Sequence, residues 1–520
     1  MNGAQALLQT MEQLGVDTCF SNPGTSEMHF VAALDDVPGV RGILTLFEGV
    51  ATGAADGFGR VTGRPAATLL HLGPGLGNGL ANLHNARRAA TPLLNVVGDH
   101  ATHHVALDAP LQSDIEAVAS SVSTWLRTSA SPDSLVADAI EAVEAALHAP
   151  RGVATLVLPA DVSWGELSAA PPQAPKLTAQ AAPVDADVLE RAAQALRGDG
   201  VVLFVGGDAM TPAGLRVLGR IASHVQVRVV SETFSSIVER GAGRYAPERL
   251  GYLAEFARAQ LAEARTLVLA GAPAPVSFFA YPGQPGTIAP NGCAEVTLAG
   301  PGDDVVSALE AVAELLGVPA EDVAGMPAVL PDVAHGALNA QSMAAAVAAT
   351  ITEGTIVVDE SNTSGIYLPG FTAGCPPHRW TALTGGSIGY GMPVATGAAV
   401  GDPSVRVLNL ESDGSAMYTL QALWTQAREG LNVTTVVLSN RSYAVLNMEL
   451  DRVGATAHGS QARAMLDLEP PVLDFVALAR GMGVPACRVE TAEDLRDAIL
   501  RANAADGPQL IEAVMPKGLG

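Results

Sequence analysis

The sequence predicts an α/β protein made of three doubly wound domains, each built on a parallel sheet. Short apolar runs rich in β-branched residues alternate with segments of helical periodicity along almost the whole chain, which is the pattern of βαβ units. Two Ala/Pro-rich stretches, residues 166–185 and 317–336, lack that periodicity and are typical of linkers. Because 520 residues exceed what one hydrophobic core accommodates, we expect domains at 1–165, 186–320 and 338–520.

Each block contains runs that are expected to form strands. The first block ends on ATLVLP (154–159), which follows the helical segment DSLVADAIEAVEAALH. The second contains VVLFVGG (201–207) and TLVLAG (266–271), and the third contains TIVVDE, VRVLNL (405–410) and TTVVLSN (434–440). This alternation favours a parallel sheet in every block.

The composition and charge exclude several classes of protein. Hydrophobic residues make up 48% of the chain and charged residues 16%, which fits a globular protein and not a disordered one. The formal net charge is −24 and no cluster of Lys and Arg is present, so nucleic acid and anionic membranes are poor partners. No pair of cysteines has the spacing of a metal or redox site, which predicts thiols in a reducing compartment. The cysteines are Cys19, Cys293, Cys375 and Cys487.

No segment is expected to cross a membrane or to act as a signal peptide. Residues 1–15 read as an amphipathic helix that contains Glu12. Prolines interrupt the uncharged stretch 266–293, and glycines interrupt the stretch 384–401, so neither can form a continuous spanning helix. We therefore expect a soluble, cytoplasmic protein.

A polar motif follows two strands of the third block. One strand runs into Asp413 and Gly414, a helix follows, and the next strand ends on Asn440. Because such a crossover returns the chain to the same edge of the sheet, Asp413 and Asn440 are expected to lie close together, where open α/β sheets bind ligands. Their oxygens and a loop carbonyl suit Mg²⁺, and the N–H groups of Ser415 and Ala416 suit a phosphate. An Asp-Gly turn and a separate Asn cap are the alternative for either residue alone.

These residues resemble the magnesium–diphosphate motif of thiamine diphosphate (ThDP)-dependent enzymes, usually written GDG…NN. Here SDGS is followed 27 residues later by NRSY, so that Ser412 replaces the first Gly and Arg441 the second Asn. The retained Asp and Asn are the coordinating side chains of the motif, and the family's backbone-carbonyl ligand falls on Ser442. The resemblance therefore implies Mg²⁺ bound by Asp413, Asn440 and Ser442.

Further matches to this family extend over nearly the whole chain. SNPGTSEM (21–28) is similar to the N-terminal substrate loop, and LFEGVATGAADGFGR (46–60) to the segment that carries the invariant glutamate. DESNTSG (359–365) resembles the loop that approaches the diphosphate, and GGSIGYGMP (385–393) the segment beneath the cofactor. The subfamilies that the chain resembles are benzoylformate decarboxylase and the acetolactate synthase catalytic (large) subunit. The resemblance makes the three blocks a pyrimidine-binding, a middle Rossmann-like and a diphosphate-binding domain.

The resemblance also implies roles for residues around the cofactor. Glu48 would hydrogen-bond the aminopyrimidine ring and favour the tautomer that takes the C2 proton. From the residues alone, Glu48 could equally be a helix-start acid favoured by the macrodipole. Ile388 would bend the cofactor, and the carbonyl of Gly386 would accept from its amine. The other cofactor contacts implied are Asn362, Thr363, Gly414, Ser415 and Tyr443.

Residues of the implied substrate pocket distinguish the two subfamilies. His71 stands where benzoylformate decarboxylase has a catalytic His, although a single His at a strand end is by itself ordinarily structural. Thr25 stands where that enzyme has a substrate-binding Ser, and Gln112 resembles an active-site Gln of acetolactate synthases. Glu449 replaces a pocket aromatic; a carboxylate there would favour a polar or cationic substrate, or be a helix-surface charge. The decarboxylase's second active-site His has no counterpart, and Ala280 stands near its position.

The reaction implied is the decarboxylation of a small 2-oxo acid through an enamine intermediate, with release of CO₂. Protonation of the enamine would give an aldehyde, whereas addition to a second carbonyl would give a 2-hydroxy ketone or acetolactate. FAD is not expected, because GAPAPVSFFAYPGQ (271–284), in the region where acetolactate synthases hold FAD, carries no charge. The shared active sites of the family imply a homodimer, assembled into a homotetramer.

Two other functions fit some of the residues. GGSIG (385–389) also matches the nucleophile motif of α/β-hydrolases, with Ser387, Asp413 and His458 in the order of a catalytic triad. Against this, 384 residues would precede the motif, which is too many for that fold, and neither the coupling of Asp413 with Asn440 nor the N-terminal block would be explained. A relative that binds ThDP without turnover is the other alternative, and the retention of Glu48 argues against it.

Overall fold

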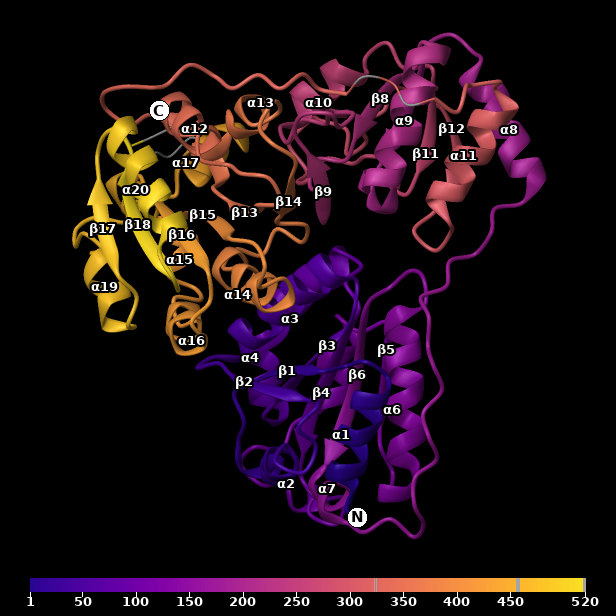
Figure 1. The fold of residues 1–520 in the computed structure, drawn as a ribbon, viewed down its shortest axis with the longest axis vertical. Helices are drawn as coiled ribbons and strands as arrows, with labels where there is room; N and C mark the ends of the chain where they lie inside the picture. Colours follow the sequence, from indigo (N-terminus) through magenta and orange to yellow (C-terminus); the bar gives the residue numbers. More distant parts are fainter. Residues whose placement is uncertain (322, 324, 455–458, 518–520) are drawn as a thin grey trace.

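Three α/β lobes make up the chain in the computed structural model, which describes all residues except 322, 324, 455–458 and 518–520. In Figure 1 the N-terminal lobe lies at the bottom, the middle lobe at the upper right and the C-terminal lobe at the upper left. The named strands of each sheet pair in parallel, apart from one antiparallel edge strand. This architecture confirms the predicted fold class. No helix in the described part of the chain is both long and apolar enough to cross a membrane.

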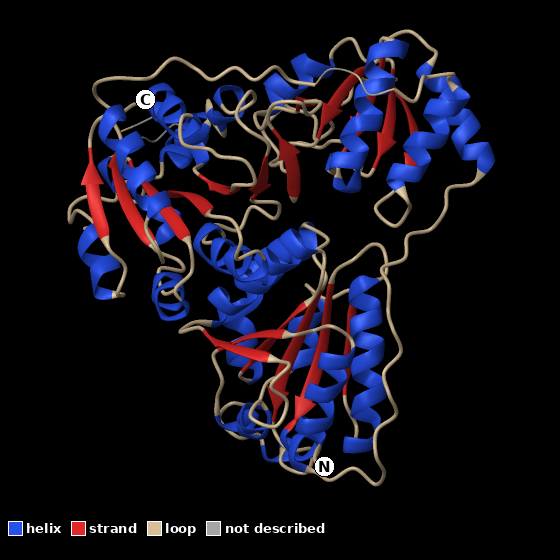
Figure 2. Cartoon of the chain, in the orientation of Figure 1, coloured by secondary structure: helices blue, strands red, loops and turns tan. Residues whose placement is uncertain are grey.

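The N-terminal lobe holds a six-stranded sheet in the order β2-β1-β3-β4-β6-β5. Every residue of β3 and β6 is buried, as expected for parallel strands with helices on both faces (Figure 2). The strands are β1 (Thr18–Ser21), β2 (Arg41–Leu44), β3 (Ala66–Leu70), β4 (Leu93–Asp99), β5 (Trp125–Thr128) and β6 (Val153–Pro159). The helices are α1 (Gly3–Gln13), α2 (Met28–Ala33), α3 (Glu48–Thr62), α4 (Leu72–Arg88), α5 (Ile115–Ser120), α6 (Pro132–Leu147) and α7 (Ala160–Trp164).

The middle lobe holds a five-stranded sheet in the order β10-β8-β7-β11-β12. Residues 166–185, expected to be a linker, contain no named helix or strand and run up to this lobe along the outside of the molecule (Figure 1). The strands are β7 (Val201–Val205), β8 (Arg228–Ser231), β10 (Glu248–Arg249), β11 (Thr266–Ala270) and β12 (Ala294–Ala299). The helices are α8 (Ala186–Leu196), α9 (Pro212–Val225), α10 (Ala254–Leu261) and α11 (Val305–Leu315).

The C-terminal lobe holds a seven-stranded sheet in the order β17-β18-β16-β15-β13-β14-β9. The strands are β13 (Ile356–Glu360), β14 (His378–Ala382), β15 (Val407–Ser412), β16 (Val433–Ser439), β17 (Ala486–Val489) and β18 (Gln509–Val514). The helices are α12 (Ala340–Ala348), α13 (Leu368–Phe371), α14 (Gly391–Gly401), α15 (Asp413–Ala416), α16 (Ala422–Glu429), α17 (Ala444–Arg452), α18 (Ser460–Ala464), α19 (Phe475–Gly481) and α20 (Ala492–Ala504).

The edge strand β9 (Ile237–Arg240) comes from the middle block of the sequence but completes the C-terminal sheet. It pairs antiparallel with β14, with Ile237 opposite Thr381 and Val238 opposite Trp380. All four of its residues are half-buried, so its burial does not alternate as it would in an ordinary edge strand. The pairing joins the two lobes through backbone hydrogen bonds.

The N-terminal and C-terminal lobes meet where α3 packs against α14, near the centre of Figure 1. Glycines bring the two backbones together: a Cβ atom on Gly57 would lie 2.1 Å from the carbonyl oxygen of Val394. A Cβ atom on Gly397 would lie 1.7 Å from the carbonyl oxygen of Ala54. Because nothing larger than hydrogen fits there, the glycine-rich sequences of both helices are explained by close packing.

Candidate active site

The structure brings Asp413 and Asn440 together at the carboxyl ends of neighbouring strands. Asp413 begins α15 directly after β15, Asn440 follows β16, and the two strands pair along their length. One carboxylate oxygen of Asp413, Oδ2, accepts the backbone N–H of Arg441 at 2.6 Å, and Oδ1 accepts that of Gly414 at 2.8 Å. Both side chains are buried. The crossover therefore produces the adjacency that the sequence motif predicts.

The oxygen atoms around Asp413 are of the hard type that binds divalent cations. Burial raises the pKa of Asp413 to about 6, while hydrogen bonds from backbone N–H groups oppose that rise. Asn440 Oδ1 accepts the N–H of Ser442 at 2.9 Å, and Arg441 between them takes a left-handed φ of 58°. A carboxylate, an amide oxygen and a backbone carbonyl suit Mg²⁺, whose charge would compensate the buried carboxylate. No cluster of three His, Cys, Asp or Glu side chains offers another metal site in the described part of the chain.

The residues expected around the diphosphate converge on the same edge. Asn362 Nδ2 donates to Ser412 Oγ at 2.9 Å and to Ser415 Oγ at 3.2 Å. Thr363 lies beside Asn362 in the 3-10 helix η4 (Asn362–Gly365). A Cβ atom on Gly414 would lie 2.4 Å from the ring of Tyr443, so the ring and the loop are in direct contact. The arrangement leaves room for glycine only, as a close approach of backbone to a phosphate also requires.

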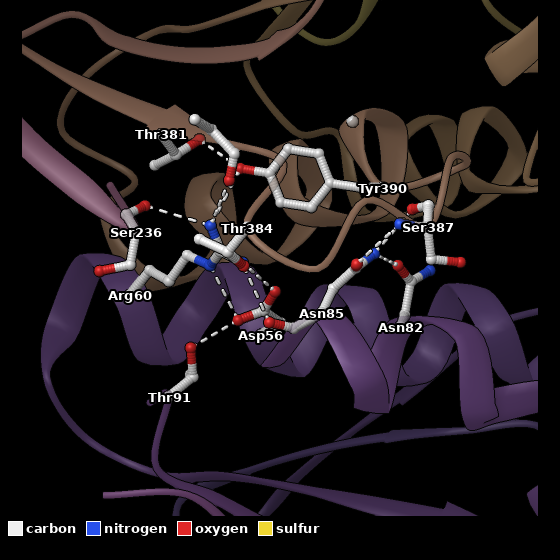
Figure 3. Close-up of polar contacts among 12 residues, drawn as sticks. Asp56, Arg60, Asn82, Asn85, Thr91, Ser236, Thr381, Thr384, Ser387 and Tyr390 are labelled. Atoms are coloured by element: carbon white, nitrogen blue, oxygen red, sulfur yellow. Dashed lines mark hydrogen bonds and ion pairs between the residues drawn. The ribbon is translucent and has the colours of Figure 1, made fainter. Parts of the chain in front are cut away.

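The loop that carries Gly386 and Ile388 is clamped by α4 of the N-terminal lobe (Figure 3). Asn85 Nδ2 donates to the carbonyl of Ser387 at 2.8 Å, and Asn85 Oδ1 accepts the N–H of Ser387 at 3.2 Å. Gly386 has a left-handed φ of 75°, and Ile388 is partly buried against the cluster around Tyr390. The backbone of this loop is therefore fixed from both lobes.

A buried carboxyl that sequence reasoning missed holds the end of this loop. Glu360 ends β13, and its two oxygens accept the N–H groups of Gly389 and Tyr390, each at 2.8 Å. Burial raises the pKa of Glu360 to about 7, and burial together with Glu360 raises the pKa of Glu411 on β15 well above its usual value. The signal in the sequence is that two strand-like runs, VVDE and VLNLE, each end on a glutamate, and these two runs form neighbouring strands.

A second buried network joins all three lobes beneath the loop (Figure 3). Arg60 of α3 forms a buried ion pair with Asp56 at 2.8 Å. Its guanidinium also donates to the carbonyl of Ala382 at 2.8 Å, to the carbonyl of Ser236 at 3.1 Å and to Thr384 Oγ1 at 3.1 Å. Arg60 thus fixes the start of the loop that carries Gly386.

Glu48 lies at the opposite end of α3, as its first residue. Its carboxylate is buried and accepts from the amide groups of Asn78 at 2.9 Å and Asn22 at 3.2 Å. An acid placed only for the macrodipole would face solvent, so burial between two amides favours a functional role over a helix-start charge. Sequence reasoning missed both asparagines.

His71 lies close to Glu48. Its Nδ1 lies 2.8 Å from Oε2 of Glu27, a buried carboxyl that also accepts the N–H of Gly24 at 2.8 Å. Burial raises the pKa of Glu27, and the charge of His71 opposes that rise. A Cβ atom on Gly75 would lie 3.3 Å from His71 Cβ and 3.4 Å from Glu48 Oε1, so these two side chains border one glycine. Because His71 is paired with a buried carboxyl and lies next to Glu48, its placement favours a role in the site over a purely structural one.

The remaining pocket candidates differ in how they are placed. Thr25 is exposed on the 3-10 helix η1 (Thr25–Glu27). Gln112 donates to the carbonyl of Ser113 at 3.2 Å, while its own buried Oε1 has no hydrogen-bond partner in the described structure. Gln112 therefore has an acceptor free for a ligand.

Glu449 is neither an open pocket carboxylate nor a loose surface charge. Its Oε2 accepts from the hydroxyl of Tyr281 at 2.9 Å, and its Oε1 lies 3.3 Å from Arg452 Nε. Arg452 pairs with Glu255 of the middle lobe and stacks 4.7 Å from the centre of the Tyr281 ring. These contacts bind α17 to the middle lobe and use the charge of Glu449 for that purpose.

The hydrolase triad finds no geometric support. The Asp413 carboxylate is engaged by the backbone N–H groups of Gly414 and Arg441, and both backbone groups of Ser387 are held by Asn85. His458, the third member, lies outside the described residues.

Comparisons with known proteins agree with the geometry. Residues 1–120 match the N-terminal TPP binding domain of thiamine pyrophosphate enzymes, and residues 367–513 match the C-terminal TPP binding domain. The "Putative acetolactate synthase large subunit IlvX" of Mycobacterium tuberculosis is 54% identical over 100% of both chains. Benzoylformate decarboxylase of Pseudomonas aeruginosa is 28% identical over 98% of this chain and 97% of that one. The structure of a ThDP-dependent 4-hydroxybenzoylformate decarboxylase of Rhodococcus jostii RHA1 covers 100% of both chains, with a TM-score of 0.87 and 24% identity.

Proposed function

Because the chain belongs to the thiamine pyrophosphate (ThDP)-dependent enzymes of the decarboxylase and acetolactate synthase family, we propose that it decarboxylates a small 2-oxo acid with the help of ThDP and Mg²⁺. The observation that carries the proposal is the buried Asp413–Asn440 pair at the ends of β15 and β16. When bound, ThDP supplies the electron sink that cleavage of the bond to the carboxylate requires. The protein supplies position, electrostatics and proton transfer.

The C-terminal lobe provides the binding half of the site. Asp413, Asn440 and the carbonyl of Ser442 hold Mg²⁺, which suits their oxygen donors. Asn362 and Ser415 flank the diphosphate, and their mutual hydrogen bond keeps both side chains on the same edge. Asp413 and Asn440 are buried, and their low exposure to solvent strengthens each electrostatic contact.

The N-terminal lobe provides the proton-handling half. Glu48 gives or takes a proton at its carboxyl group, and the amide groups of Asn78 and Asn22 orient that group. In the tautomer whose Nδ1–H donates to Glu27, Nε2 of His71 is free to take up a proton and exchange it with the substrate. This pair supports the decarboxylase outcome, in which a proton must reach the new carbon centre and an aldehyde leaves.

Acetolactate synthase activity is the second candidate. The relative with 54% identity is named as a putative acetolactate synthase large subunit, and the Oε1 of Gln112, which has no partner among the described residues, offers an acceptor for a ligand. FAD forms no part of either proposal, because residues 271–284 carry no charged side chain for its phosphates.

Product analysis separates these outcomes. A panel of 2-oxo acids is incubated with the purified protein, ThDP and Mg²⁺, and CO₂, aldehyde and acetolactate are quantified separately. We expect CO₂ with aldehyde. Acetolactate as the main product would replace the first candidate by the second, and no CO₂ from any substrate, or equal CO₂ from a Glu48→Gln control, would contradict both.

We further propose a homodimer, assembled into a homotetramer, in which the two halves of each site come from different chains. Within one chain, no hydrogen bond between described residues joins Glu48 or His71 to the C-terminal lobe. Large apolar side chains beside both halves are exposed: Leu46 is 44% exposed next to Glu48, and Tyr418 is 53% exposed near Asp413. Such exposure fits surfaces that a second copy covers.

Mixing two inactive variants tests this arrangement. Glu48→Gln and Asp413→Ala chains are unfolded together, refolded as a mixture and assayed. If the halves come from different chains, each mixed dimer regains one intact site, and a random mixture recovers about a quarter of wild-type activity. No recovery, with mixed dimers present on a native gel, would place both halves in one chain.

A further inference from the structure

A cavity of about 330 Å³ lies between the middle and C-terminal lobes. It is bordered by the end of β8, by residues 237–249 and by Pro369 and Trp380 of the C-terminal lobe. The volume is in the range of small-molecule sites. No residue that we place in the catalytic machinery lines this cavity.

Three arginines line the cavity without carboxylate partners. Arg240 ends β9, Arg244 follows it in the connecting loop, and Arg249 lies on β10. The ion pairs of the described residues include none of the three guanidinium groups. Arg240 stacks on Trp380, 5.0 Å from the ring centre, and Arg249 donates to the carbonyl of Thr233 at 2.6 Å. Arg244 Nε is buried and has no hydrogen-bond partner.

The charge balance inside the cavity favours an anion. Burial, followed by repulsion from Arg249, lowers the pKa of Arg240 to about 10, while the nearby charge of Asp359 opposes that fall for Arg240 and for Arg249. Two carboxyls, Glu232 and Glu239, also line the cavity, and burial raises the pKa of Glu232 to about 7. Arg240 and Arg244 are half-buried, and Arg249 is exposed at the rim of the cavity. The buried Nε of Arg244 has no partner, and an unpartnered buried donor costs free energy. A bound anion that accepts from Arg244 Nε would remove this cost.

We propose that this cavity binds a small phosphate-bearing anion, with Arg244 and Arg249 as its main donors. A guanidinium group can bind two phosphate oxygens through a pair of N–H donors. The guanidinium groups of Arg244 and Arg249 come from different elements and can hold one phosphate between them. The cavity exceeds the size of a phosphate ion alone, so a phosphate ester also fits.

The position of the cavity connects this site to the cofactor loops. Pro369 lies on α13, which closely follows η4 with Asn362, and Ala382 precedes the loop that carries Gly386. A ligand there contacts both lobes and is placed to bias the loops that hold ThDP.

Calorimetric titration of the enzyme loaded with ThDP and Mg²⁺ tests the proposal. Inorganic phosphate and glucose 6-phosphate are the two probes, at constant ionic strength. We expect one site per chain for at least one probe and an affinity about tenfold or more weaker in Arg244→Met and Arg249→Met, because each loses charged hydrogen bonds. Arg216→Met, an exposed arginine of α9 in the same lobe, is the matched control and should bind as the wild type does.

The two probes also distinguish the sources of the phosphate group. Binding of both identifies a general phosphate site, and binding of the ester alone identifies a phosphorylated metabolite. No heat with either probe, or equal affinities in the wild type and both cavity variants, overturns the proposal. If Arg244→Met does not fold, Arg244→Lys is used instead. It keeps the positive charge but loses the paired N–H donors, so it should also weaken binding. Because the readout is binding and not turnover, the result is independent of the proposed reaction.

Discussion

Removal of Arg60 is the perturbation that most sharply tests how the three lobes are held together. The Arg60→Met variant leaves Asp56 buried, with Thr91 Oγ1 at 2.6 Å as its remaining side-chain partner. It also removes the donors to Ala382, Ser236 and Thr384, which belong to the other two lobes. Breaking a buried ion pair from one side costs about 3–5 kcal/mol. We therefore expect a loss of that size in the free energy of unfolding.

The nearby pair of Arg64 and Asp17 is the matched control. Its side chains are 48% and 43% exposed, so Arg64→Met should cost less than about 1 kcal/mol. A third variant combines Arg60→Met with Asp56→Asn, and it should be more stable than Arg60→Met alone because no uncompensated charge remains buried.

Urea unfolding at a fixed protein concentration, followed by circular dichroism and by hydrogen exchange of α3 amides, measures these differences. The affinity for ThDP should fall together with stability in Arg60→Met, because Arg60 fixes the start of the loop that carries Gly386. The reasoning is refuted if Arg60→Met is no less stable than Arg64→Met, or if its ThDP affinity equals that of the wild type.

Three further predictions concern individual side chains. Glu48→Gln should retain ThDP while steady-state turnover falls roughly 10²–10⁴-fold, since proton transfer is lost but binding is not; normal turnover would exclude the assigned role. Tyr281→Phe should lower the thermal midpoint and leave the preference between cationic and apolar 2-oxo acids unchanged, because Glu449 is engaged by Arg452; a new cationic preference would show that Glu449 faces the substrate. The folded-state pKa of Glu232 is raised to about 7 from 4.5, so its contribution to stability is present below pH 4.5 and is lost as pH rises to about 7. Glu232→Gln should therefore gain stability relative to wild type between pH 4.5 and 7 in thermal scans, and a pH-independent difference would contradict the burial of that carboxyl.

Local patterns are sufficient to predict the sheets and the adjacency of Asp413 and Asn440. Asp413 and Asn440 lie at the two ends of one crossover, so the topology of βαβ units alone places them together. The buried strands also carry their own signal, because a strand covered on both faces is apolar throughout.

The partners of Glu48 and His71 could not be predicted because the sequence separations are long and the residue types are common. Asn78 lies 30 positions from Glu48, and Glu27 lies 44 positions from His71. The β9 pairing with β14 was missed for a related reason: four half-buried residues carry no alternation, and their partner strand belongs to another lobe. The role of Glu449 could not be predicted because it depends on contacts with Tyr281 and Arg452 that form only in the folded chain.

Retention of ThDP as a function of Mg²⁺ in Asp413→Ala tests the central claim most directly. Wild type, Asp413→Ala and the control Asp402→Asn, a carboxylate of the same lobe paired with Arg379, are titrated with ThDP at several Mg²⁺ concentrations. We predict that Mg²⁺ tightens ThDP binding in wild type and in the control, and that Asp413→Ala loses more than roughly 100-fold in affinity, which exceeds the effect of removing an outer-sphere partner. ThDP binding in Asp413→Ala that matches wild type at every Mg²⁺ concentration would contradict the account.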